Sequence, residues 1–205
     1  MSQIAENVTN AKPIAQGAVW AGSTSMDRPT DANSSLPSEA TGLGYVNEDG
    51  LTKTVERDGE DINAWGGDAV LRVQTSYAES YSFGLIETTS AVLAEAFGQE
   101  NVETTDDGIK VLHRSAELPD RMFIFEIALT QGRKQRTVIP RGKVTEIEDI
   151  EYQDGEAVTY GLTLSALPDS DGNYGYTYIT DGDTNGGDGG NGGDNGSDGG
   201  DESGE

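Results

Sequence analysis

Residues 64–98 change their hydrophobic period partway, and this change restricts the fold more than any other feature of the chain. Apolar and polar side chains alternate over residues 71–77 and again over residues 81–85, with an interruption at residues 78–80. Alternation with a period of two predicts half-buried β-strands. The segment therefore predicts a strand, a turn and a second strand. One face of the first strand is expected to carry Leu71, Val73 and Tyr77.

A single helix is expected to follow these strands. Its apolar face consists of four residues at helical spacing, Val92, Leu93, Ala96 and Phe97. Three hydroxyl side chains precede this face, and each of them can cap the first turn: Thr88, Thr89 and Ser90. Gly98 can adopt the left-handed conformation that ends many helices. We expect no second helix of comparable clarity.

Short alternating runs separated by turn sequences make up the rest of the chain. Residues 17–22 and 121–130 predict strands, whereas residues 57–63 are polar and turn-like. Asp-Gly pairs favour tight hairpins, and they occur at 49–50, 58–59, 107–108, 154–155 and 171–172. These features predict a mainly β fold, an antiparallel β-sandwich or open barrel with one packed α-helix. Since exposed strand edges pair with other chains, the sheet should be either closed or built for assembly.

Three regions differ in composition. Residues 1–16 are polar and lack a pattern, which predicts a flexible N-terminal arm. Residues 17–180 hold the alternating runs and form the expected β domain. Residues 181–205 contain no aliphatic or aromatic side chain, so they cannot bury a core. This last region is therefore predicted to be a disordered acidic tail.

Several functions are disfavoured by composition. The chain has no cysteine, which excludes disulfides and thiolate metal sites. His113 is the only histidine, which argues against a Ser-His-Asp triad and against a multi-histidine metal centre. We therefore predict no catalytic residue, no metal and no cofactor. No apolar run approaches the ~20 residues needed to cross a bilayer, and no secretory signal is apparent, so we expect no membrane insertion.

The chain is strongly acidic. It has 13 basic and 37 acidic residues, a formal net charge of −24. Residues 181–205 hold eight acidic residues and no basic one, so the remaining 180 residues still carry a net charge of −16. A surface of this sign repels nucleic-acid phosphates, because phosphate binding depends on Lys and Arg.

Two arrangements of acidic residues could in principle form a functional site, a calcium site or a catalytic pair of carboxylates. The spacing of Asp169, Asp171 and Asn173 resembles part of a calcium loop, but the glycine is misplaced and no closing glutamate follows, so a hairpin turn is favoured. A pair of carboxylates in a glycosidase is the weakest functional hypothesis, because no spacing selects two of them.

Five basic residues cluster within eleven positions, and acidic residues follow directly. The basic residues are Arg133, Lys134, Arg136, Arg141 and Lys143, and the acidic ones begin with Glu146, Glu148 and Asp149. One interpretation is an internal hairpin whose opposite charges pair across strands. The other is a head-to-tail contact between subunits, of the kind that closes rings. Charge alone leaves both open.

Several short motifs, taken in order, resemble the major tail tube proteins of siphophages. They are GYVNEDGL at 44–51, DINAWGG at 61–67, FGLIET at 83–88, RTVIP at 136–140, GKV at 142–144 and the closing run at 160–169. The resemblance covers roughly residues 15–180. It implies a β-sandwich subunit without catalysis, which forms hexameric rings that stack into a tube around a channel for DNA.

The resemblance also implies partners and contact residues. The partners are further copies of the chain, the tape measure protein, and the tail terminator and tail tip proteins, with DNA only in transit. The expected location is the phage tail, and the host cytoplasm during assembly. The loop expected to contact neighbouring rings contains Asn47, Glu48, Asp49, Arg57, Asp58, Asp61, Trp65 and Asp68. The alternative function is an acidic β-sandwich binding module, a capsid decoration protein or an adhesin domain.

Overall fold

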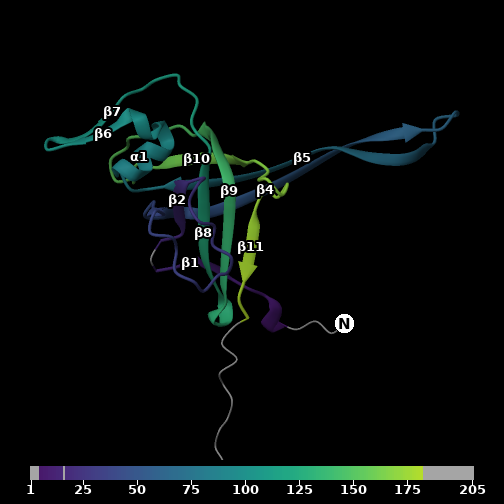
Figure 1. Ribbon diagram of the computed structural model, residues 1–205, viewed down its shortest axis with the longest axis horizontal. Coiled ribbons are helices and arrows are strands. Elements are labelled where there is room, and N and C mark those ends of the chain that lie inside the picture. The colour runs from purple at the N-terminus through teal and green to yellow at the C-terminus, as the bar shows by residue number, and fades with distance from the viewer. Residues whose placement is uncertain (1–4, 16, 182–205) are drawn as a thin grey trace, which may run out of the picture.

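The computed structural model describes residues 5–15 and 17–181, which form a strongly bent antiparallel β-sheet with one α-helix (Figure 1). The main path of the sheet runs β3-β2-β8-β9-β10-β5-β4, while β1 pairs with β8 and β11 with β9. The nine strands are β1 (Ala11–Pro13), β2 (Val19–Ser23), β3 (Thr41–Gly42), β4 (Val46–Asn63), β5 (Ala69–Leu85), β8 (Arg121–Leu129), β9 (Lys134–Ile147), β10 (Tyr160–Ala166) and β11 (Tyr176–Ile179). The predicted mainly β, antiparallel fold with one helix is confirmed.

The sheet does not close on itself in the described part of the chain. Its path ends at β3 on one side and at β4 on the other. Of the two alternatives that the sequence left, a closed sheet and a sheet with open edges, the structure has the second. The longest strand, β4, is an edge strand over its full 18 residues.

The core lies where β8 crosses the base of β5. Phe125 stacks on Tyr81 with ring centroids 5.2 Å apart, and Phe83 meets it edge-on at 5.6 Å. The opposite face of β8 packs a second, smaller cluster that contains Met26, Ile124 and Val138. Both faces of β8 are therefore buried, and the predicted alternation of this strand is confirmed.

The helix α1 (Ser90–Phe97) is confirmed together with its cap. The Thr89 hydroxyl accepts a hydrogen bond from the Val92 amide at 3.3 Å, and Gly98 has a positive φ of 98°. Val92 and Ala96 are buried in the main core. Among the described residues, no helix has the length and apolar character needed to span a bilayer. The 3-10 turns are Ala5–Asn7, Gln99–Asn101 and Thr130–Gly132.

Two predictions about residues 46–85 are wrong. Residues 57–63 are not a turn and residues 78–80 are not a break, because β4 and β5 pair continuously as one long hairpin. Most of this hairpin is exposed on both faces, so burial imposes no alternation of apolar and polar side chains on its strands. The polar residues and the Asp58-Gly59 pair therefore predicted a turn where there is none. This pair lies inside β4 at a β-bulge.

The same bulge changes which side chains share a face. Asp58 pairs with Ser76 and the next residue, Gly59, pairs with Gln74, so Thr75 is the extra residue. Since consecutive residues point to opposite faces, the alternation of β5 is inverted beyond Thr75. Tyr77 therefore does not share a face with Leu71 and Val73, contrary to the sequence prediction.

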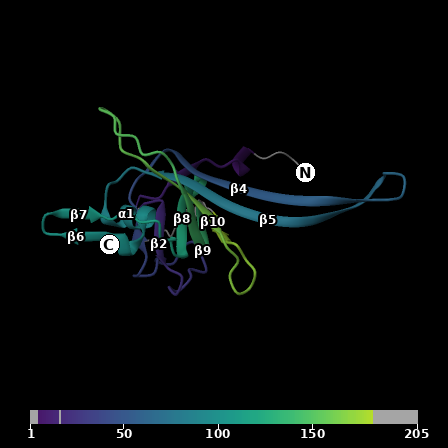
Figure 2. The same ribbon diagram turned by 90° about the horizontal axis from the view of Figure 1, so that it is seen from above.

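The other Asp-Gly pairs lie in turns or irregular segments. Asp107-Gly108 joins β6 (Val102–Thr105) to β7 (Gly108–Val111), as predicted, and this small hairpin lies at the end of the molecule opposite the long hairpin (Figure 2). Asp49-Gly50 lies in a wide bulge of β4. Residues 154–155 and 171–172 lie in turns.

The segment around Asp169 is a turn held by protein donors. The Asp169 carboxylate accepts hydrogen bonds from the Tyr176 hydroxyl at 2.6 Å and from the Asn173 and Asp171 amides at 3.0 and 2.9 Å. These bonds, the one from Tyr176 first, hold the pKa of Asp169 below its ordinary value. The hairpin-turn interpretation is therefore preferred over the calcium loop.

The domain boundaries stay predictions. Residues 11–13 of the predicted N-terminal arm form β1 and pair with β8. The acidic tail predicted at 181–205 lies, apart from Asp181, outside the described residues.

Candidate assembly surfaces

The distal hairpin, defined here as residues 55–77, projects from the body of the molecule (Figures 1 and 2). Almost all of its residues are exposed. It carries six of the eleven large apolar side chains that are exposed in the described structure: Val55, Ile62, Trp65, Val70, Leu71 and Val73. Trp65, in the turn at the tip, is fully exposed. This concentration on a projecting element is typical of an interaction site.

The strand register places three of these side chains, Ile62, Leu71 and Val73, on one face. Ile62 lies directly opposite Leu71, and Glu60 lies opposite Val73 on the same face. The other face carries the Arg72–Asp61 ion pair at 3.5 Å and, nearer the body, the exposed Val55. A two-stranded ribbon is marginally stable alone in water. An apolar stripe on such a ribbon gains stability if a partner covers it.

A buried carboxylate fixes the distal hairpin to the body. Glu79 on β5 is 6% exposed and accepts hydrogen bonds from the hydroxyls of Tyr77 (2.6 Å) and Tyr81. Lys53 Nζ on β4 lies 2.7 Å from the same carboxylate. Burial alone would raise the pKa of Glu79, but the lysine and the two tyrosines outweigh it and hold the pKa below its ordinary value.

This network predicts a pH dependence of stability. Since the pKa of Glu79 is lower in the folded state than in the unfolded state, its stabilisation is present at neutral pH and is lost as the pH falls through the folded-state pKa. Glu79→Gln is expected to lower the free energy of unfolding at pH 7 by about 1.5–3 kcal/mol, the range for hydrogen bonds to charged groups. It should also flatten the loss of stability on acidification. Urea denaturation over a pH series measures both effects.

The matched control for this variant is Glu60→Gln, on the exposed face of the distal hairpin. Its stability should stay near the wild-type value, because changes at exposed positions cost little. An acid limb of the same slope in Glu79→Gln and in the wild type would contradict the role of Glu79.

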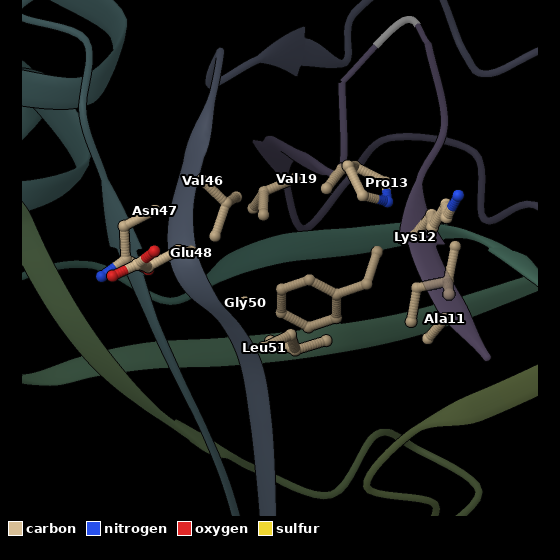
Figure 3. A pocket seen from close by; sticks show the side chains of 12 residues that line it. Ala11, Lys12, Pro13, Val19, Val46, Asn47, Glu48, Gly50 and Leu51 are labelled. Atoms are coloured by element: carbon tan, nitrogen blue, oxygen red, sulfur yellow. The ribbon is translucent and has the colours of Figure 1, made fainter.

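A pocket of about 410 Å³ lies at the base of the same hairpin (Figure 3). It is bounded by β1, β2, the start of β4 and β8, and its walls are mainly apolar: Pro13, Val19, Val46, Leu51 and Phe125. Lys12 and Glu48 also line it. Lys12 forms no ion pair with any residue that the structure describes.

The predicted inter-ring residues fall in two separate places. Asn47, Glu48 and Asp49 lie in the bulge of β4 beside the pocket, where Asn47 Nδ2 donates to Asp49 at 2.9 Å. The rest belong to the distal hairpin: Arg57, Asp58, Asp61, Trp65 and Asp68. One hairpin therefore has an apolar tip at one end and an apolar pocket at the other.

The basic cluster is divided by the structure. Arg136 is 3% exposed and pairs with Glu126 on the neighbouring strand, and it also donates to the carbonyl oxygens of Asp31 (2.8 Å) and Ser34 (2.9 Å). Arg141 and Lys143 pair with two acidic residues of the preceding loop, Asp120 and Glu117. A buried side chain cannot contact a second subunit, so Arg136 is removed from the proposed interface.

The remaining charged residues of this region are accessible. Lys134 is exposed, and neither it nor Arg133 forms an ion pair with a described residue. Glu146, Glu148 and Asp149 are exposed and likewise have no ion-pair partner among the described residues. Internal pairing, one of the two interpretations that the sequence left open, therefore occurs for three basic residues of the cluster, but with acidic residues other than these.

An open antiparallel sheet whose edge strand extends into an exposed, partly apolar hairpin is typical of structural subunits that contact other chains. The sequence matches the family model of phage tail tube proteins over residues 5–186, and the chain belongs to this family. It is thus a structural component of a phage tail. No curated protein matches the sequence.

Two solved structures are similar to this chain at low scores. One is the anti-feeding prophage cap, the AFP tube terminating cap, at 12% identity and a TM-score of 0.39, covering 88% of this chain and 99% of that one. The other is the sheath/tube terminator of an extracellular contractile injection system, PVC, in the extended state, at 9% identity and a TM-score of 0.37, covering 83% and 98%.

Proposed function

We propose that the chain is the major tail tube subunit of a siphophage and that it assembles into stacked hexameric rings around a negatively charged channel for DNA. The observation that carries this proposal is the distal hairpin, whose apolar side chains project into solvent from a subunit of the tail tube family. The tape measure, tail terminator and tail tip proteins are the partners that such a tube requires, and assembly takes place in the host cytoplasm.

The occupant of the pocket at the hairpin base is, in this proposal, the Trp65 tip of a second copy. About 14 residues of strand at ~3.3 Å each separate the pocket residue Leu51 from Trp65, roughly 45 Å, so a subunit's own tip does not reach its own pocket. The tip offers an exposed indole, and the pocket offers mainly apolar walls that can cover it. A head-to-tail contact of this kind closes into a ring or continues along a filament, depending on the rotation between successive subunits.

The open edges of the sheet support a second, lateral contact between subunits. The long edge strand β4 presents backbone groups that a second copy can pair with, and no described strand pairs with its outer edge. Exposed acidic residues such as Glu146, Glu148 and Asp149 are then available to Arg133 and Lys134 of a neighbouring subunit.

The charge of the chain is compatible with a conduit for DNA. A net charge of −16 over residues 1–180 makes an anionic lumen wall, which keeps phosphates from binding as DNA passes. Screening limits this effect to about 8–10 Å at physiological ionic strength, so it acts close to the wall.

Electron microscopy of the purified protein tests this function. Negative-stain images at high protein concentration, or after addition of a tail initiator complex, are expected to show hollow tubes with a ring repeat and six-fold symmetry. A protein that stays monomeric with an initiator present, or a tube whose inner wall is basic, would contradict the proposal.

A further inference from the structure

Five of the thirteen basic side chains form no ion pair with a described residue. They are Lys12, Arg57, Arg114, Arg133 and Lys134. Arg57 lies over the ring of Tyr77, 5.0 Å from its centroid, and Arg114 follows β7 in another part of the fold. The other three gather at one place, which we call the basic patch (Lys12, Arg133 and Lys134).

Strand pairing creates the basic patch. Lys12 on β1 pairs with Ala128 on β8, and Ala128 pairs with Lys134 on β9. Paired residues point to the same face, so the two lysines flank a methyl side chain at a backbone separation of about 10 Å, two strand spacings. Arg133 joins them, because its Nε donates to the Thr180 carbonyl at 3.3 Å beside Lys134.

The acidic segment of the chain leaves the fold at this patch. The Lys134 amide donates to the Thr180 hydroxyl at 2.8 Å, and the Thr180 amide donates back to the Lys134 carbonyl at 2.9 Å. Asp181 is the next residue, and residues 181–205 contain eight acidic and no basic side chains. A chain of this charge is repelled by most of a subunit that is itself acidic and is attracted by the basic patch.

We propose that the acidic segment 181–205 binds the basic patch of its own subunit. Each charge pair on an exposed surface contributes little, but a tethered segment has an effective local concentration of about millimolar or more, so several weak pairs suffice. The binding is electrostatic, because the segment has no aliphatic or aromatic side chain. It is therefore expected to weaken steeply as salt is added.

This binding has a consequence for assembly, which rests on the proposed function. Lys12 lies on β1 between the pocket residues Ala11 and Pro13, so an acidic segment bound at the basic patch lies beside the pocket assigned to the Trp65 tip. Residues 56–72 of the distal hairpin contain five acidic and two basic residues, so the bound acidic segment repels the hairpin of a second copy and competes with its docking. The segment then raises the protein concentration at which tubes begin to form.

A paramagnetic label tests the binding itself on the full-length, unassembled subunit. The chain has no cysteine, so Ser203→Cys provides the only site for a nitroxide. In low salt, the amide NMR signals of Lys12, Ala128 and Lys134 are expected to broaden. The broadening should largely disappear at about 0.5 M salt, where the Debye length is only a few Å. It should also disappear in the Lys12→Glu/Lys134→Glu variant.

The matched control is Lys110→Glu/Arg114→Glu, which reverses two exposed positive charges in and beside β7. This variant should keep the broadening around the basic patch. Broadening that is absent, or that is the same in both double variants, would overturn the proposal. Shifts of the patch signals with short duplex DNA, without broadening from the label, would instead identify nucleic acid as the occupant and overturn it as well.

Assembly provides a second measurement that separates this inference from the proposed function. Replacing the eight acidic residues of 181–205 with Asn and Gln is expected to lower the threshold concentration for tubes several-fold, as removal of a tethered competitor should. An unchanged threshold would contradict the competition. If no variant forms tubes, the proposed function fails, whereas the NMR experiment still decides whether the segment binds the patch.

Discussion

Replacing Trp65 with alanine is expected to abolish tube assembly while leaving the folded monomer unchanged. The indole is fully exposed in the subunit, so its loss should alter the free energy of unfolding by less than about 0.5 kcal/mol. A tryptophan buried at an interface typically contributes about 2 kcal/mol or more to association, and every subunit of a tube repeats the contact. Sedimentation velocity and negative-stain microscopy measure assembly, and urea denaturation measures the stability of the monomer.

The control for Trp65→Ala is Tyr152→Ala, which truncates another exposed aromatic side chain (76% exposed) in the acidic loop after β9. Tubes should form normally in this variant. Ala11→Trp, which places an indole at the edge of the pocket, should block assembly as Trp65→Ala does, because the docking position is then occupied. Normal tubes from Trp65→Ala, or an equal loss in Tyr152→Ala, would contradict the contact.

The largest effect on stability is expected at Arg136. Arg136→Met leaves the Glu126 carboxylate buried without its partner, and breaking a buried ion pair in this way costs about 3–5 kcal/mol. The loss also removes the hydrogen bonds that hold the loop around Asp31 and Ser34 to the sheet. Urea denaturation of the monomer should show the decrease directly.

Two further variants distinguish the effect of breaking the buried ion pair on stability from the effect of removing a positive charge. Glu126→Leu/Arg136→Met should recover much of the stability, since two apolar side chains can replace a buried pair. Lys134→Met removes an exposed charge two residues earlier on the same strand and should change stability by less than about 0.5 kcal/mol. Equal stabilities of Arg136→Met and Lys134→Met would contradict the burial of this pair.

The sequence predicted the parts of the fold in which burial determines the pattern. The alternation at 121–130 was interpretable because both faces of β8 are covered, one by the aromatic core and the other by the loop before β3. The helix was predictable because its cap and its apolar face agree locally. In these segments burial of the apolar side chains determines both the hydrophobic period of the sequence and the packing in the structure.

The long hairpin was not predictable in the same way. Residues 57–63 lie in a ribbon exposed on both faces, so no apolar pattern marks them as a strand. The bulge at Thr75 cannot be recognised from side-chain types, yet it moves Leu71 and Val73 to the face opposite Tyr77. In the proposed assembly, these apolar residues contact another subunit and do not belong to the core of their own.

The assembly surfaces were predictable only in part. Trp65 was identified because the segment around it resembles tail tube proteins, whereas nothing in the sequence indicated the pocket at the hairpin base. Lys12 and Lys134 are far apart in sequence and become neighbours only through their pairing with Ala128. The burial of Arg136 likewise depends on Glu126, its partner on the adjacent strand, and a run of basic residues does not reveal which of them is buried.

The most direct test of the docking contact is a disulfide between two copies. The chain has no cysteine, so Ala11→Cys at the pocket and Ala64→Cys beside Trp65 introduce one thiol at each end of the contact. A disulfide requires the two Cα atoms to lie within about 7 Å, which a subunit's own hairpin does not allow. Oxidation of assembled tubes is expected to give a ladder of covalent oligomers, and either single variant should give none beyond dimers. Tubes that form normally but yield no ladder would contradict the account.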